Sequence, residues 1–138
     1  MKKLAILYLI LLLLATNVAI AQAPEDRARF AAEQWIVLVD DGQYEESWKE
    51  SSKVFQDAIP MDNWQKKAAA DRGQLGAKQS RKLKDIKSGS AAAKGLPAGQ
   101  YVQVKYQSSF ANKKTVTEVV TAVLESDGTW RVAAYSFN

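Results

Sequence analysis

The apolar residues in the first half of the chain recur every three or four positions, which is the spacing of one face of an α-helix. Three segments show this pattern, and each is followed by a Gly or Pro that stops a helix. The pattern predicts three short helices: from Pro24 to the stop at Gly42, from Tyr44 to the stop at Pro60, and from Asp62 or Asn63 to a break at Gly73 or Gly76.

After Gly76 the apolar positions alternate, as they do in strands that bury one face. A segment of small residues from Gly89 to Gly99 interrupts the alternation, and we expect it to form a mobile loop. Short turns indicate an antiparallel meander of four strands: Arg81 to Ser88, Tyr101 to Phe110, Thr115 to Glu125, and Thr129 to Phe137. The predicted fold class is α+β, with three N-terminal helices packed on a curved, cone-like sheet of four antiparallel strands.

The turn at residues 126–128 sets the register of the last two strands. A three-residue turn with Gly128 in the left-handed conformation keeps one apolar face intact, whereas a two-residue turn would set Leu124 opposite Arg131. We therefore expect three cross-strand pairs: Leu124 with Trp130, Ala122 with Val132, and Val120 with Ala134.

The opposite face of these strands carries a second apolar patch, formed by Val119, Val123, Ala133, Tyr135 and Phe137. A sheet that is apolar on both faces needs two covers, and three short helices can cover only one well. The pattern predicts a homodimer formed through this outer face, with Tyr135 as its anchor. The alternative is that the loop 89–99 or the chain terminus covers the patch within one monomer.

One charged residue, Glu118, interrupts the apolar face of its strand, where an unpaired carboxylate would be costly. A three-residue turn at 112–114 would place Glu118 opposite Ser108 and diagonal to Tyr106.

Three interpretations of Glu118 remain open. With Tyr106, Ser108 and Arg81 it could bind a small polar ligand in a semi-apolar pocket. It could act as a base in proton transfer, with Tyr106 as the hydrogen-bond donor. It could also pair with Arg72 or Arg81 and lock the helices to the sheet.

The composition excludes several classes of chemistry. The chain has no Cys and no His, which rules out thiol nucleophiles, disulfides, Cys/His zinc sites and triads that use imidazole. It also lacks the motifs of the nucleophile elbow, the phosphate loop, dinucleotide binding and calcium loops. We therefore expect no metal and no cofactor, and a binding role is favoured over an enzymatic one.

The first 21 residues have the three parts of a secretory signal. Lys2 and Lys3 supply positive charge, a run of twelve uncharged and mostly apolar residues follows, and Ala19-Ile20-Ala21 is a small-x-small cleavage site. The apolar run is shorter than the roughly 20 residues of a membrane span, so a retained anchor is the weaker alternative. We expect cleavage after Ala21, a periplasmic or secreted product, one domain over residues 22–138, and no stable membrane anchor.

The charge of the chain argues against nucleic acid as a partner. The net charge of +4 falls to +2 once Lys2 and Lys3 leave with the signal, and this is a small excess for a domain of this size. Basic side chains gather between Lys78 and Lys87, where a solvated edge strand is the preferred interpretation and an anion-binding site is the alternative.

A series of short motifs, in a fairly specific order, spans most of the chain after the signal. The motifs are Trp35 with Val39 to Tyr44 and Ser47-Trp48, Arg72 to Gly76 with Arg81, Leu96 to Tyr101, Phe110, Glu118, and Asp127 to Val132 with Tyr135. Together they resemble a bacterial family called domain of unknown function 4019. The resemblance implies secreted or envelope proteins of unknown activity, with no established catalytic residues.

The order of helices and strands also resembles the nuclear transport factor 2-like superfold, a cone that hosts isomerases, dehydratases and binding domains, often as dimers. The sequence thus predicts an exported, non-enzymatic binding or assembly module of the bacterial envelope. The alternative is a small cone-fold enzyme of the isomerase or dehydratase type that uses Glu118 as its base.

Overall fold

The structure is a computed structural model that describes residues 22–90 and 95–138. The expected signal segment 1–21 and residues 91–94 of the expected loop lie outside the described residues. The elements are α1 (Pro24–Asp40), α2 (Tyr44–Glu50), α3 (Lys53–Ala58), α4 (Met61–Leu75), β1 (Lys78–Gly89), β2 (Tyr101–Phe110), β3 (Val116–Leu124) and β4 (Trp130–Phe137).

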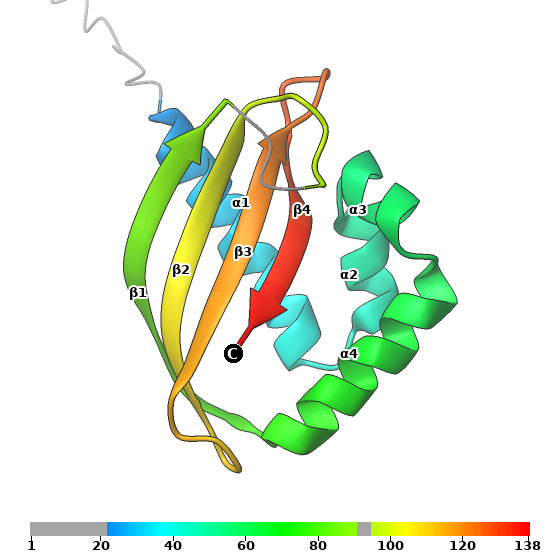
Figure 1. Cartoon of the computed structure of the whole chain (residues 1–138), viewed down its shortest axis with the longest axis vertical. Coiled ribbons are helices and arrows are strands. Elements are labelled where there is room, and N and C mark those ends of the chain that lie inside the picture. Colours follow the sequence, from blue (N-terminus) through cyan, green and yellow to red (C-terminus); the bar gives the residue numbers. More distant parts are fainter. Residues whose placement is uncertain (1–21, 91–94) are drawn as a thin grey trace, which may run out of the picture.

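The four strands form one antiparallel sheet in the order β1-β2-β3-β4, which confirms the predicted meander. The sheet is curved, α1 runs along one of its faces, and α2, α3 and α4 stand beside β4 (Figure 1). The prediction of an α+β fold with N-terminal helices packed on a four-stranded sheet is confirmed. No helix within the described residues combines the length and the apolar character needed to cross a membrane.

The prediction of one helix from Tyr44 to Pro60 is wrong, because the chain breaks there into α2 and α3 at Ser51 and Ser52. Ser52 caps α3 by accepting a hydrogen bond from the Phe55 amide at 3.2 Å, and its own N–H donates to the Val132 carbonyl at 2.8 Å. Short polar side chains compete with a helix for backbone partners. The two serines therefore end α2 and direct the chain toward β4.

The core lies between α1 and the inner face of the sheet, and it extends to the other helices through three aromatic rings. The ring centroids of Trp35 and Phe55 are 5.8 Å apart, and those of Phe55 and Trp64 are 5.0 Å apart, both edge to face. Such pairs add to the stabilisation that comes from area burial alone. They join α1, α3 and α4 into one apolar cluster.

The register of β3 and β4 is confirmed only next to the turn. Gly128 has a φ of +81°, Leu124 lies opposite Trp130, and Ala122 lies opposite Val132, as predicted. Beyond Ala122 the ladder shifts by one residue, so Val120 lies opposite Tyr135 and not Ala134. A β-bulge that adds one residue to a strand reverses the faces of all residues after it.

This bulge overturns part of the predicted outer patch. Tyr135 and Phe137 lie on the inner face, where Tyr135 packs against Trp35 and Phe137 packs beside Leu75 and Phe110. Tyr135 therefore cannot anchor an outer interface.

The remaining apolar positions of the outer face are largely covered by the chain itself. Val123 and Ala133 are buried together with Tyr101, and Val54 of α3 and Leu96 pack against them. Leu96 belongs to the segment 89–99, so the alternative of a cover within one monomer gains support. The homodimer stays a prediction, although Tyr135, its expected anchor, does not lie on the outer face.

The register of β2 and β3 also differs from the expected one. Phe110 and Lys113 exchange backbone hydrogen bonds of 2.8 and 3.3 Å, so the turn holds two residues where three were expected. The ladder beyond the turn pairs Ser108 with Val116, one residue out of step with the turn, so Glu118 lies opposite Tyr106 and not Ser108. Because the change is an even number of positions, Glu118 still faces the inner side.

The tip of this turn rests on the end of α4. The backbone N–H of Asn112 donates to the Leu75 carbonyl at 2.9 Å, and Gly76 follows Leu75 with a φ of +75°. A Cβ at Gly76 would lie 3.0 Å from Asn112 Nδ2 and 3.1 Å from Ala111 Cβ.

Replacing Gly76 by Ala should lower the free energy of unfolding by about 1–3 kcal/mol, because an L side chain is strained at this backbone conformation and also meets the turn. Urea unfolding measures the effect. Gly73→Ala is the matched control, since Gly73 lies within α4 with open space around it and Ala is the better helix former. Equal effects of the two substitutions would contradict the docking of the turn on α4.

Candidate functional site

Glu118 lies on β3, is 0% exposed, and has both of its carboxylate oxygens engaged. Arg81 donates to it through Nε at 2.7 Å and through Nη2 at 3.1 Å. The Tyr135 hydroxyl donates to Oε1 at 2.6 Å, and the Ser108 hydroxyl donates to Oε2. The interpretation of Glu118 as a carboxylate paired with arginine is therefore the one that the geometry supports.

Asp40, at the end of α1, accepts from the same arginine on its other side. Arg81 Nη1 lies 2.6 Å from Oδ2, and Arg72 Nη1 of α4 lies 2.7 Å from Oδ1. Arg72 Nη2 also lies 3.5 Å from Glu118 Oε1. We call Asp40, Arg72, Arg81 and Glu118 the ion network; its two carboxylates and two guanidinium groups balance in charge.

Burial and charge act against each other within the ion network. Burial alone would raise the pKa of Asp40, but Arg81 and Arg72 outweigh it and hold that pKa below its usual value of 3.8. Burial alone would lower the pKa of Arg81, and its hydrogen bonds to Asp40 and Glu118 raise that pKa instead. Burial, with the charge of Glu118, raises the pKa of Tyr135, so its phenol stays protonated and donates.

Of the four residues predicted for this site, Glu118, Ser108 and Arg81 are joined by hydrogen bonds. Tyr106 lies opposite Glu118, but its hydroxyl is buried and has no hydrogen-bond partner within the described residues. Burial raises the pKa of this phenol as well. Asp40 has no local signal in the sequence, and the alternation predicts the wrong face for Tyr135 because the bulge is not visible in it.

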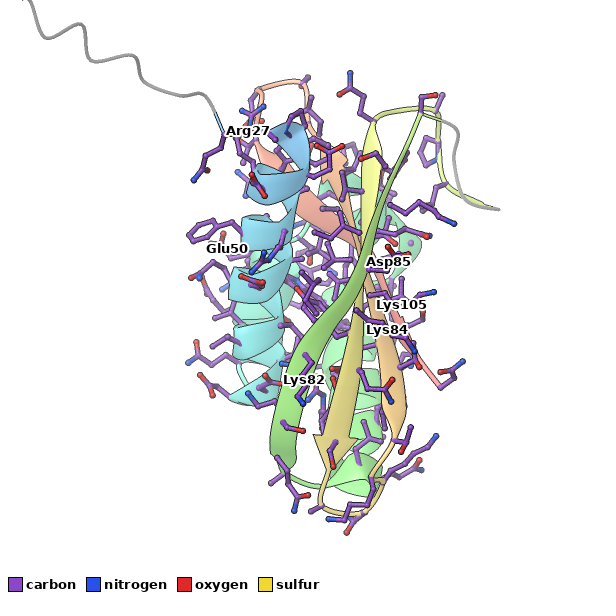
Figure 2. The ribbon with its side chains drawn as sticks, turned by 90° about the vertical axis from the view of Figure 1, so that its left-hand side faces the viewer. Arg27, Glu50, Lys82, Lys84, Asp85 and Lys105 are labelled. Carbon is purple, nitrogen blue, oxygen red and sulfur yellow. The ribbon has the colours of Figure 1, made fainter. Side chains whose placement is uncertain are left out.

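The basic segment from Lys78 to Lys87 forms β1, one edge of the sheet. Arg81 turns inward to the ion network and Lys78 Nζ lies 3.8 Å from Asp40 Oδ2, while Lys82 and Lys84 are exposed near Asp85 and Lys105 (Figure 2). This arrangement agrees with a solvated edge strand. No group of three or more acidic side chains within residues 22–90 and 95–138 could hold a metal ion.

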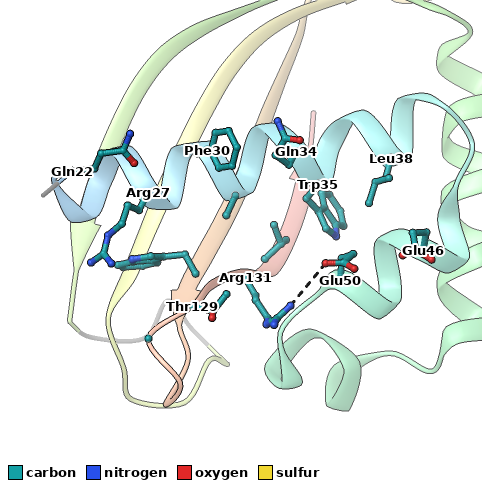
Figure 3. A pocket seen from close by; sticks show the side chains of 14 residues that line it. Gln22, Arg27, Phe30, Gln34, Trp35, Leu38, Glu46, Glu50, Thr129 and Arg131 are labelled. Carbon is teal, nitrogen blue, oxygen red and sulfur yellow. Dashed lines mark ion pairs between the residues drawn. The ribbon is translucent and has the colours of Figure 1, made fainter. Parts of the chain in front are cut away.

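A groove of about 660 Å³ lies between α1, α2 and the start of β4 (Figure 3). Its residues come from Gln22 before α1, one stripe of α1, one side of α2, the turn before β4 and the start of β4: Gln22, Arg27, Phe30, Ala31, Gln34, Trp35, Leu38, Glu46, Glu50, Gly128, Thr129, Trp130, Arg131 and Val132. Phe30 is 62% exposed, and Arg131 faces Glu50 at 3.9 Å. The sequence carries no signal for this groove, because Phe30 and Trp130 are 100 positions apart.

Removing the carboxylate of Asp40 should destabilise the protein and flatten its response to acid. Asp40→Asn leaves Arg72 and Arg81 without one of their two carboxylate partners. It should therefore lower the free energy of unfolding by about 3 kcal/mol at pH 7. The pKa of Asp40 is lowered in the folded state, so its contribution is present above pH 3.8 and is lost as the pH falls from there to the lowered value.

The difference in the free energy of unfolding between wild type and Asp40→Asn should therefore become smaller below about pH 4. Urea unfolding at several pH values measures it. Asp41→Asn is the control, since Asp41 is the exposed neighbour of Asp40 and belongs to no ion pair within the described residues. A difference in the free energy of unfolding that stays constant down to pH 2 would show that Asp40 is not held ionised by the two arginines.

Comparisons with known proteins address the fold and the family. Comparison with curated proteins found no match. Among solved structures, the chain is similar to Aln2 from a Streptomyces species, with a TM-score of 0.51 and 12% sequence identity over 85% of this chain and 92% of that chain. At this identity the likeness shows the fold alone. The model of the family "Protein of unknown function (DUF4019)" matches residues 31–135, so the chain belongs to the DUF4019 family.

Proposed function

We propose that the protein is an exported binding module without enzymatic activity, and that its ligand site is the groove. The observation that carries this proposal is the contrast between the two polar regions of the molecule. Glu118 is fully buried and surrounded by its own donors, whereas the groove is open and has the exposed ring of Phe30 on its wall. Open, mainly apolar concavities with a few polar groups are the usual places for small ligands.

The enzymatic alternative asks Glu118 to act as a base, and the geometry gives it little support. A base needs a lone pair directed at its substrate, and both oxygens of Glu118 accept from Arg81, Tyr135 or Ser108. None of the four residues predicted for the Glu118 site lines the groove. The ion network is better explained as a lock between helices and sheet.

The proposal of export rests on the first 21 residues, with their basic start, apolar run and small-x-small end. A periplasmic or secreted binding module also fits a domain without Cys, since a chain of this size can be stable through packing without disulfides.

N-terminal sequencing of the protein recovered from the cell envelope tests export. We expect the sequence to begin at Gln22, because cleavage should follow Ala21. A variant with Ala19 and Ala21 both replaced by Lys should remain uncleaved. An intact Met1 in the wild-type envelope protein would contradict the proposal.

Native mass spectrometry of the same envelope protein tests binding. We expect a species heavier than the bare chain by the mass of one small molecule, and this excess should vanish after unfolding and refolding in ligand-free buffer. Phe30→Glu should abolish the excess, because it puts a charge on the groove wall. Val37→Glu is the control, since Val37 is an exposed apolar residue of α1 outside the groove. An excess mass that survives Phe30→Glu would place the ligand elsewhere.

A further inference from the structure

The indole N–H of Trp130 is the exception among the four tryptophans of the chain. Trp35 donates to the Ser47 carbonyl at 2.8 Å, Trp48 to the Ile59 carbonyl at 2.8 Å, and Trp64 to the Ser47 hydroxyl at 2.9 Å. Trp130 is 7% exposed, and its Nε1 has no acceptor within the described residues. A buried donor without a partner is destabilising, and buried polar groups without partners are rare.

This donor belongs to a residue that lines the groove, so an acceptor on a bound ligand would satisfy it. The groove residues of α1 run from Arg27 to Leu38, which corresponds to about 17 Å along the helix axis. Phe30, Ala31 and Leu38 make this wall largely apolar. The ligand that fits is therefore elongated and mainly apolar, with an acceptor oxygen at one point.

The charges of the groove indicate which end of such a ligand is polar, and of which sign. Arg27 lies at one end of the groove and Glu46 at the other, with Arg131 and Glu50 between them (Figure 3). Arg27 has no ion pair within the described residues, and Arg131 has only the 3.9 Å contact to Glu50. Trp130 and Arg131 are the first two residues of β4, and both line the groove together with Arg27.

We propose that the groove binds an anionic amphiphile, a carboxylic acid with a linear apolar chain, and this rests on the proposed binding function. One carboxylate oxygen accepts from Trp130 Nε1, and Arg131, with Arg27, supplies the positive charge. A guanidinium group matches a carboxylate in geometry and in charge. The apolar chain lies along Phe30, Ala31 and Leu38 of α1. Trp130 Nε1 is shielded from water, so a side chain beside it moves when the carboxylate oxygen reaches it.

The test uses the ¹⁵N-labelled protein isolated from the envelope and three probes with the same apolar chain: octanoate, octanol and octyltrimethylammonium. Octanoate should shift the indole N–H resonance of Trp130, while the resonances of Trp48 and Trp64 stay in place because those donors already have acceptors. Octanoate should bind at least about tenfold more tightly than octanol, and the cationic probe should not bind.

Four variants then separate the contacts. Trp130→Phe should weaken octanoate binding about tenfold or more by removing the donor, whereas Trp48→Phe should not change it. Arg131→Gln should weaken octanoate binding and leave octanol binding unchanged. If Trp130→Phe does not fold, this comparison alone tests whether the groove recognises a carboxylate. Val37→Glu should bind octanoate as the wild type does.

The outcomes distinguish the ligand class from the proposed function. Octanol that binds as tightly as octanoate, with a Trp130 resonance that does not move, would overturn the acidic head group and leave a groove for neutral ligands. Tighter binding of octyltrimethylammonium than of octanoate would also overturn the acidic head group, and it would indicate a cationic head group held by Glu46 and Glu50. If no probe shifts any resonance and the envelope protein carries no excess mass, both the ligand class and the binding function fail.

Discussion

Two arginines shared between the buried Glu118 and the half-buried Asp40 tie the helical half of the molecule to the sheet. Asp40 belongs to α1, Arg72 to α4, Arg81 to β1 and Glu118 to β3, so each charge comes from a different element. Any one of these charges left unpaired in the interior would carry a large desolvation penalty. The elements can therefore meet stably only in an arrangement that brings all four groups together.

The bulge in β4 connects the ion network to the apolar core. It turns Tyr135 inward, where its ring lies 5.5 Å from that of Trp35 and its hydroxyl donates to Glu118 at 2.6 Å. Without the extra residue at this point, Tyr135 would face outward and Glu118 would lose one of its donors. An irregularity of one residue thus supplies both a core ring and a hydrogen bond.

The ion network and the groove divide the polar interior of the protein between structure and recognition. In the ion network every charged group is satisfied by another group of the chain, so nothing there calls for a ligand. In the groove, Phe30 is exposed and Trp130 has a donor that no described residue satisfies. Trp35 lines the groove and also packs in the core, so the wall of the groove is held by the same cluster that stabilises the fold.

The sequence by itself determined that helices precede strands, the meander, the Gly128 turn and the inward direction of Glu118, because these follow from periodicity and from local backbone preference. It did not determine that Asp40 meets Arg81, that Tyr135 turns inward, or that Trp130 lacks an acceptor. Each of these depends on residues far apart in the chain. Alternation reports which face a side chain takes only while the ladder is regular, and whether a donor is satisfied depends on every element packed around it. Only the tertiary structure could decide them.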